Sequence, residues 1–180
     1  LVDVRLTFAR GLSAPLPDVP HTVTIRPHQP DDVPRLRAIA RDSYTDSRYY
    51  HDPCFPRAQA DALYETWINN SCAGYADAVL VAEHDGLISG FISCHLRDTS
   101  ERDAQVGEIG LVGVAQESRG QQVGGQLVHA ALGWFSGQGA ARVQVVTQAR
   151  NIAAQRLYQR AGFVSDSIAY WYHKWFTACP

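Results

Sequence analysis

The sequence predicts a mixed α/β domain, because a buried strand, a glycine-rich loop and a helix follow one another near its middle. Residues 105–114, QVGEIGLVGV, are apolar and β-branched enough for a buried strand. Residues 115–125 form a polar loop that contains several glycines. Apolar residues at helical spacing begin at Val123. This order directs free backbone N–H groups and the positive end of a helix dipole toward one point, so we expect an anion to bind there.

The first half of the chain predicts two strands and two helices. Residues 1–10 alternate apolar and polar side chains, as a strand does, and residues 11–21 form a proline-rich connector. Residues 22–26 predict a short strand. One helix is expected to open at Pro30, with acidic residues at its positive end, and a second at Pro56.

The second half adds a hairpin and alternating strands and helices. Two apolar strands, 78–83 and 87–96, flank an Asp-Gly dipeptide, which favours a tight hairpin turn. Residues 141–148 predict a further strand, and the aromatic segment 167–176 predicts the last one. The predicted order over residues 22–176 is therefore β-α-α-β-β-β-α-β-α-β.

Composition limits the class of protein. A length of 180 residues, with 46% hydrophobic and 19% charged residues, suits one globular domain. The net charge of −2 gives no electrostatic reason to expect nucleic acid or an anionic membrane as partner. The chain shows neither an apolar run of membrane-spanning length nor a signal peptide, so we expect a cytoplasmic protein. Four scattered cysteines without a C-x-x-C pair are expected to be free thiols: Cys54, Cys72, Cys94 and Cys179.

Three kinds of phosphate-binding loop share the order of strand, glycine loop and helix. A P-loop needs Gly-Lys-Ser/Thr, which this chain lacks. A dinucleotide fingerprint needs G-x-G-x-x-G and an acidic residue ending the next strand, whereas that strand ends here in Thr147-Gln148. The third kind is a coenzyme A loop, Q/R-x-x-G-x-G/A. Residues 119–124 resemble it, except that Gln122 replaces the first motif glycine.

A second motif extends this resemblance. Residues 151–163, NIAAQRLYQRAGF, match the complete pattern N-x-x-A-x-x-x-Y-x-x-x-G-F. Asn151 and Tyr158 are two helical turns apart, so they share one helix face at a separation of about 10 Å. With both motifs, residues 22–176 resemble the GCN5-related N-acetyltransferases, the GNAT superfamily. The resemblance implies a mixed central sheet flanked by about four helices, acetyl-CoA as cosubstrate, and no metal.

The resemblance also implies where acetyl-CoA binds. Val112 and Val114 are expected to hydrogen-bond the pantetheine arm through their backbone, where a bulge permitted by Gly110 or Gly113 splays the strand; core packing is the alternative. Asn151 is expected to bond the pantetheine, to cap its helix, or both. Seven loop residues are expected to cradle the pyrophosphate, unless they form an ordinary loop: Arg119, Gly120, Gln121, Gln122, Val123, Gly124 and Gly125.

Two residues are the catalytic candidates. Tyr158 is the expected general acid, because coenzyme A leaves as a thiolate when an amine attacks the thioester; a packing tyrosine is the alternative. The reference pKa of a phenol, about 10, exceeds the roughly 8.5 of a thiol, so hydrogen bonding to sulfur matters as much as proton transfer. Glu108 shares a strand face with Val114, where some family members place a general base. A rim salt bridge, with ordered water as the base, is the alternative.

Four short segments resemble a narrower group, the bacterial dTDP-fucosamine acetyltransferases. They lie within residues 47–50, 64–70, 147–151 and 169–171. That group acetylates the 4-amine of a dTDP-4-amino-4,6-dideoxyhexose, a small-molecule acceptor. Another small-molecule or peptide amine, or a non-catalytic acyl-CoA-binding module, is the alternative.

The acceptor is expected to contact the loop between the first two helices. Arg48 would pair with a pyrophosphate, while Tyr49 or Tyr50 would stack on a base or sugar. Trp67 is a further acceptor candidate, but the favoured interpretation places Tyr64 and Trp67 in the core. The seven histidines show no metal-ligand spacing.

The two ends of the chain carry the remaining predictions. The chain begins with Leu and contains no Met, so residues 1–21 are expected to be an arm and linker that ends an upstream region. Residues 22–180 are the expected acetyltransferase domain. The last strand holds more aromatic residues than one sheet face can bury, so a homodimer through it or through the arm is expected.

Overall fold

The computed structural model describes residues 1–16, 18–44, 47–98 and 105–176, and these contain seven strands and five helices. The strands are β1 (Asp3–Gly11), β2 (Thr24–Pro27), β3 (Ala78–His84), β4 (Leu87–Asp98), β5 (Gln105–Val114), β6 (Arg142–Gln148) and β7 (Val164–Trp171). The helices are α1 (Val33–Ser43), α2 (Arg48–His51), α3 (Arg57–Asn70), α4 (Val123–Gly137) and α5 (Ile152–Arg160). Single helical turns lie at Pro30–Asp32, Ser71–Tyr75 and Gln116–Ser118.

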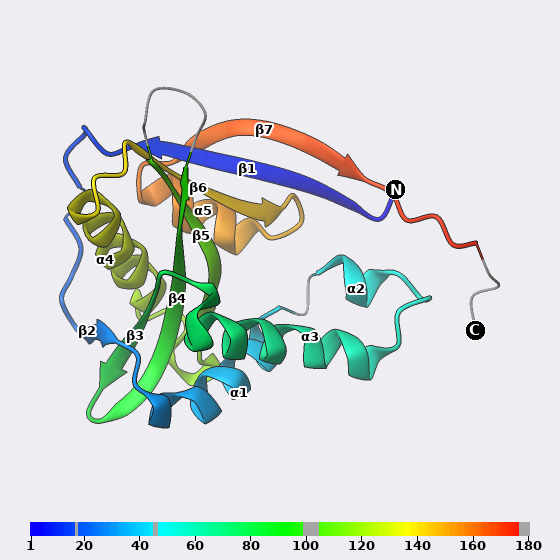
Figure 1. The fold of residues 1–180 in the computed structure, drawn as a ribbon, viewed down its shortest axis with the longest axis horizontal. Coiled ribbons are helices and arrows are strands. Elements are labelled where there is room, and N and C mark those ends of the chain that lie inside the picture. The colour runs from blue at the N-terminus through cyan, green and yellow to red at the C-terminus, as the bar shows by residue number, and fades with distance from the viewer. Residues whose placement is uncertain (17, 45–46, 99–104, 177–180) are drawn as a thin grey trace.

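All seven strands form one mixed sheet in the order β2-β3-β4-β5-β6-β1-β7 (Figure 1). Only β5 and β6 run parallel, and the other neighbours are antiparallel. Asp85 and Gly86, between β3 and β4, both have positive φ, as a tight two-residue hairpin turn requires. The predicted mixed α/β class is confirmed.

Two elements differ from the prediction. The short helix α2 lies within a segment that the sequence predicts as a loop. The last strand was predicted at 167–176, but β7 spans Val164–Trp171. Its end follows from pairing, because Trp171 lies opposite Asp3, where β1 begins.

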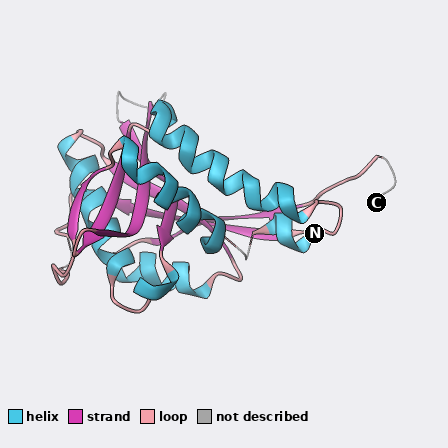
Figure 2. Ribbon diagram, turned by 90° about the horizontal axis from the view of Figure 1, so that it is seen from below, coloured by secondary structure: helices cyan, strands magenta, loops and turns pink. Residues whose placement is uncertain are grey.

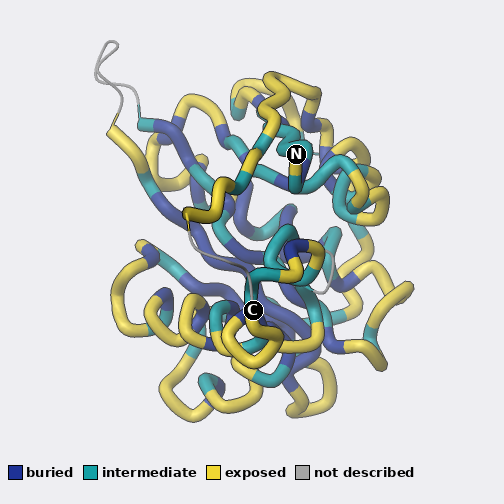
Figure 3. The backbone as a smooth tube through the Cα atoms, turned by 90° about the vertical axis from the view of Figure 1, so that its right-hand side faces the viewer, coloured by how far each residue is buried: buried dark blue, intermediate teal, exposed yellow. Residues whose placement is uncertain are grey.

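Helices lie on both faces of the sheet (Figure 2), and each face buries a separate core. Helices α1 and α3 pack together, and α1 contacts β4 and β5. Helix α4 covers β3, β4 and β5 from the other face and contacts α5. Buried segments therefore run along the strands in the interior, with exposed segments outside them (Figure 3). Fully buried side chains from both cores include Leu36, Ile68, Phe91, Leu127, Phe135 and Val145.

Strand β1 is an inner strand of the sheet, paired with β6 on one side and β7 on the other. The predicted arm, residues 1–21, thus contributes to the same sheet as residues 22–180. Figure 1 shows β1 and β7 side by side across the top of the molecule. Strand β7 is the edge, and Ile168 and Tyr170 are 61% and 65% exposed. A homodimer that covers this edge stays a prediction.

The cysteines depart from the prediction of four free thiols. Cys54 is disulfide-bonded, so the prediction was wrong for this residue. Cys pairing depends on which loops the fold brings together, and spacing along the sequence does not reveal that. Cys72 and Cys94 are free, and burial raises their pKa values to about 11 and about 12. Both thiols are therefore protonated and unreactive at neutral pH. Cys179 lies outside the described residues.

Candidate active site

Strands β5 and β6 separate partway along their length. They pair only from Val106 to Ile109 on β5. A register shift against β4 follows at once, so β5 carries the bulge that the sequence predicts near Gly110. A Cβ at Gly110 would lie 2.6 Å from Nε2 of His95 and 2.8 Å from Oγ of Ser93, so this position needs glycine. The bulge opens a gap in the middle of the sheet.

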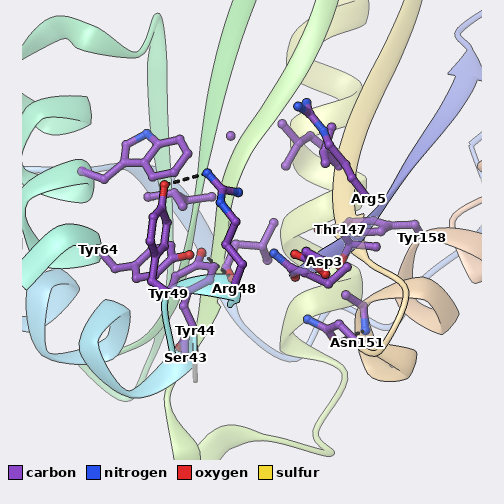
Figure 4. Close-up of a pocket in the computed structure, with 18 of the residues that line it drawn as sticks. Asp3, Arg5, Ser43, Tyr44, Arg48, Tyr49, Tyr64, Thr147, Asn151 and Tyr158 are labelled. Carbon is purple, nitrogen blue, oxygen red and sulfur yellow. Dashed lines mark hydrogen bonds between the residues drawn. The ribbon is translucent and has the colours of Figure 1, made fainter. Parts of the chain in front are cut away.

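A cavity of about 280 Å³ lies in this gap. Its walls are residues 108–112 of β5, residues 146–148 of β6 and side chains from both faces of the sheet. Figure 4 shows these side chains converging from α1 and α3 on one side and from α5 on the other. Those not on β5 or β6 are Asp3, Arg5, Ser43, Tyr44, Arg48, Tyr49, Tyr64, Trp67, Asn151, Ala154, Tyr158 and Trp171.

Tyr158 lines the cavity from α5 and is also a packed residue. Its ring lies 6.4 Å from Phe8 and 5.8 Å from Phe163, between ring centroids, and the residue is only 5% exposed. Burial raises the pKa of Tyr158 well above its ordinary value. Among the described residues, no group hydrogen-bonds to its hydroxyl. At physiological pH this phenol is therefore a protonated hydrogen-bond donor.

Asn151 caps the helix that carries Tyr158. Its Oδ1 accepts a hydrogen bond of 3.0 Å from the Ala154 N–H, and the residue also lines the cavity. The cap predicted for Asn151 is confirmed, and its bond to a ligand stays a prediction. Gly162, with φ of 82°, follows the helix in the left-handed conformation that is common at helix C-termini. Local sequence thus sets both ends of α5 and so the placement of Tyr158.

The backbone of β5 beyond the bulge faces two polar side chains. Tyr44 donates a hydrogen bond of 2.9 Å from its hydroxyl to the Val112 carbonyl. A carbonyl has two lone pairs, so Val112 keeps one acceptor position. The Val114 carbonyl accepts a hydrogen bond of 3.3 Å from Nε of Arg119. Burial raises the pKa of Tyr44 well above normal, which keeps this donor protonated.

Glu108 lies in the cavity wall and forms a salt bridge. Its Oε2 is 3.2 Å from Nε of Arg97 on β4. This is the salt bridge expected for Glu108 as the alternative to a catalytic role. Both side chains are partly exposed, so the pair contributes about 1 kcal/mol or less to folding. Glu108 nevertheless lines the cavity, and its role as a general base stays a prediction.

The glycine loop contains two residues in the left-handed conformation just before helix α4 begins. Gln122, where the motif has glycine, takes φ of +61°, and Gly120 takes φ of +79°. The substitution therefore leaves the left-handed turn in place. Helix α4 then begins at Val123 without a side-chain cap, so its first N–H groups remain available. Arg119 points elsewhere, because its Nη2 donates to the Asp42 carbonyl at 3.1 Å.

The start of α4 packs against the two elements that carry the cavity residues Val112 and Tyr158. A Cβ at Gly124 would lie 3.4 Å from Leu157 of α5 and 3.7 Å from Val114 of β5. At Gly125 an added Cβ would meet no atom within 4 Å. The first turn of α4 therefore fits between the end of β5 and α5. Gln121 supports the loop by donating from its side-chain amide to the Glu117 carbonyl at 3.0 Å.

Two of the three predicted acceptor residues line the cavity. The Arg48 guanidinium lies 4.5 Å from the ring centroid of Tyr49 and donates to its hydroxyl at 2.6 Å. Tyr50 is turned away, because its hydroxyl donates to Asp61 at 2.6 Å and Arg57 lies 4.9 Å over its ring. The structure therefore brings Arg48 and Tyr49, but not Tyr50, to the site.

Trp67 departs from the prediction. It is 37% exposed and lines the cavity, so its assignment to the core was wrong. The buried stripe of α3 repeats every four residues at Ala60, Tyr64 and Ile68, and Trp67 falls beside this stripe. Tyr64 is 6% exposed, as predicted for a core residue, and it also contacts the cavity.

Sequence reasoning missed the cavity residues of β1, Asp3 and Arg5. No local motif marks them, because they reach the site only through the pairing of β1 with β6 and β7. Trp171 falls within one of the short motifs, but without an assigned role. Among the described residues, no cluster of three His, Cys, Asp or Glu side chains could hold a metal ion. No described helix has the length and hydropathy that crossing a bilayer requires.

Comparison with known proteins gives one family. Residues 34–163 match the model of the Acetyltransferase (GNAT) family. The chain is 32% identical over 149 residues to the spore coat polysaccharide biosynthesis protein SpsD of Bacillus subtilis, covering 83% of this chain and 50% of that protein. It is 29% identical over 148 residues to a dTDP-fucosamine acetyltransferase of Escherichia coli, covering 81% of this chain and 61% of that enzyme. The chain thus spans about half the length of these relatives.

Other relatives are named for a different acceptor, mycothiol. A mycothiol acetyltransferase of Stackebrandtia nassauensis is 34% identical over 100 residues, covering 54% of this chain and 32% of that enzyme. Among solved structures, the aminoglycoside N-acetyltransferase AAC(6')-Iy in complex with CoA superposes with a TM-score of 0.64. It covers 87% of this chain and 98% of that one at 20% identity, which shows a shared fold.

Proposed function

The chain belongs to the GNAT acetyltransferase family, and on this premise we propose that it transfers acetyl from acetyl-CoA to a primary amine of a small molecule. The observation that carries the proposal is the gap between β5 and β6, with Tyr158 in its wall and the uncapped start of α4 packed against β5 and α5. An acetyl-CoA molecule lying along β5 would reach both Tyr158 and the start of α4. The pyrophosphate meets the N–H groups of α4, and the sulfur meets Tyr158.

The proposed reaction is a direct transfer. The amine lone pair attacks the thioester carbonyl carbon, a C–N bond forms, and the C–S bond breaks. The departing sulfur accepts a hydrogen bond, and then a proton, from the Tyr158 hydroxyl. The raised pKa of Tyr158 makes full proton transfer uphill, so stabilisation of the thiolate is its main contribution. Glu108 or a water molecule takes the proton from the amine.

For the acceptor, we propose the 4-amine of a dTDP-4-amino-4,6-dideoxyhexose. The similarity to a dTDP-fucosamine acetyltransferase supports this choice, as does the Arg48–Tyr49 pair in the cavity wall. A guanidinium suits a diphosphate, and a tyrosine ring suits a base or a sugar. The mycothiol acetyltransferase relatives supply the second candidate, an acceptor related to mycothiol.

Acetyl-CoA or CoA is expected to raise the melting temperature of the protein, because each would bind only the folded state. Gly125→Glu places a carboxylate at the start of α4, in open space, and should reduce this shift by repelling the pyrophosphate. Gly133→Glu is the matched control, since its position farther along α4 is also open. Thermal unfolding with and without ligand measures the shift in melting temperature for all three proteins. No shift of the unaltered protein at millimolar ligand would contradict the proposal.

Acetylation of a nucleotide sugar is the expected result of a direct acceptor assay. CoA release would be followed with dTDP-4-amino-4,6-dideoxygalactose, its glucose epimer, the deacetylated form of mycothiol and a panel of peptides. Activity on either nucleotide sugar is expected, with Arg48→Ala raising the KM of the sugar far more than that of acetyl-CoA. Activity on mycothiol-related or peptide amines alone would overturn the acceptor while leaving acetyl transfer in place.

A further inference from the structure

Two arginines from distant segments lie over one indole ring in the cavity. The guanidinium carbon of Arg48, on α2, is 4.3 Å from the ring centroid of Trp171 on β7. The guanidinium carbon of Arg5, on β1, is 5.7 Å from the same ring. All three residues line the cavity, and Figure 4 labels both arginines. The pairing of β1 with β7 creates this arrangement, since Asp3 lies opposite Trp171 and Arg5 follows two residues later.

These two arginines lack carboxylate partners among the described residues. Among the described residues, Arg48 donates only to the Tyr49 hydroxyl, and none of them is a partner for its buried Nε. Arg5 forms neither a salt bridge nor a side-chain hydrogen bond within the described chain. A buried donor without a partner destabilises the fold, and a ligand oxygen that accepted its hydrogen bond would recover that loss. Six other arginines, unlike Arg5 and Arg48, do pair with carboxylates: Arg26, Arg35, Arg37, Arg41, Arg97 and Arg150.

The nearby carboxylate does not neutralise this pair. Asp3 also lines the cavity, but its Oδ1 lies 3.3 Å from Nη2 of Arg150 and accepts the Val4 N–H at 2.9 Å. The negative charge of Asp3 is therefore directed to Arg150. The positive charges of Arg5 and Arg48 therefore remain available in the cavity wall to bind an anion.

We propose that Arg5 and Arg48, held by Trp171, bind the diphosphate of the acceptor substrate; this inference rests on the proposed function. A guanidinium offers two parallel N–H donors that match the oxygens of a phosphate. Stacking on an aromatic ring fixes the guanidinium plane and leaves the N–H edges for the ligand. Two cations suit a diphosphate better than a single carboxylate, and an uncharged acceptor would leave both unpaired. Arg5 and Trp171 thereby determine specificity for the acceptor.

This anion site is separate from the one at the start of α4. Arg5 and Arg48 come from β1 and α2, whereas the loop of Gly120 and Gln122 leads from β5 into α4. The molecule thus has one phosphate site for each substrate, on different elements around one cavity. Saturation of the first site with CoA leaves the second free to be measured.

The test is calorimetric titration of dTDP, inorganic pyrophosphate and thymidine into the protein saturated with CoA. dTDP and pyrophosphate are expected to bind, more weakly as salt rises, and thymidine is expected to bind far less well. Arg5→Gln and Arg48→Gln should each weaken dTDP at least tenfold and leave CoA binding unchanged. Arg57→Gln is the matched control, because Arg57 stacks on Tyr50 outside the cavity. Equal dTDP binding by Arg5→Gln and the unaltered protein would overturn the proposal.

Turnover separates this inference from the proposed function. If a nucleotide sugar is acetylated but Arg5→Gln leaves its KM unchanged, the inference fails and the function stands. If no nucleotide sugar is acetylated but Arg5→Gln abolishes dTDP binding, the acceptor is wrong and the anion site stands. Arg5→Lys keeps the charge without the planar fork, so an intermediate KM is expected. Melting temperatures of the variants, measured alongside, would reveal any loss of folding.

Discussion

Tyr158→Phe is expected to lower kcat by about 10²-fold or more while changing the affinity for acetyl-CoA little. The substitution keeps the ring that packs against Phe8 and Phe163 and removes only the hydroxyl in the cavity. Steady-state kinetics with saturating acceptor measures kcat, and calorimetry measures acetyl-CoA binding. Tyr44→Phe is a matched control: it removes the hydroxyl bonded to Val112, so stability should fall by about 1 kcal/mol with a much smaller loss of kcat.

The pH dependence follows from the same residue. Burial raises the pKa of Tyr158, so its protonated form persists to higher pH than for an exposed tyrosine. The rate should therefore show no decline due to Tyr158 below about pH 10, the ordinary value of a tyrosine. An unchanged kcat for Tyr158→Phe would assign this residue to packing alone.

Gly110→Ala is expected to destabilise the protein by about 1–3 kcal/mol and to weaken acetyl-CoA binding. The added methyl group would overlap the ring of His95 and the Ser93 hydroxyl, which already accepts the Leu111 N–H at 2.9 Å. Relief of this overlap must move the bulge that forms the cavity wall. Urea unfolding measures the stability, and calorimetry measures the binding.

The matched control for this change is Gly133→Ala. Gly133 lies in α4 with no atom within 4 Å of an added Cβ. Alanine there should stabilise the helix by about 0.5–1 kcal/mol. If Gly110→Ala proved as stable as the unaltered protein, the conclusion that close contacts at the bulge require glycine would be wrong.

Features that depend on neighbouring residues could be predicted from the sequence. Strand 105–114 was predicted with the bounds that β5 has, and Asn151 was placed correctly at the start of α5. Each of these depends on side-chain periodicity or on capping chemistry within a few residues. The glycine loop also keeps a left-handed residue at Gln122, where the motif has glycine.

Features that depend on distant segments could not be predicted in this way. Arg5 reaches the cavity because β1 lies between β6 and β7, and no pattern within residues 1–21 indicates that position. The disulfide of Cys54 depends on the approach of two cysteines in the folded chain, which their spacing does not reveal. For Arg5 the deciding contacts join strands that are far apart in sequence.

The inner position of β1 has a consequence for the order of folding. β1 is synthesised before every other strand, yet its two partners, β6 and β7, are the last strands to be made. During translation its backbone donors and acceptors must stay hydrated while the centre of the domain emerges. The β2–β5 half of the sheet contains only neighbours that lie closer in sequence, so it can assemble first. Closing the long loop between β1 and β6 then becomes a late, entropically costly step, and the cavity acquires its Arg5 wall only when that step is complete.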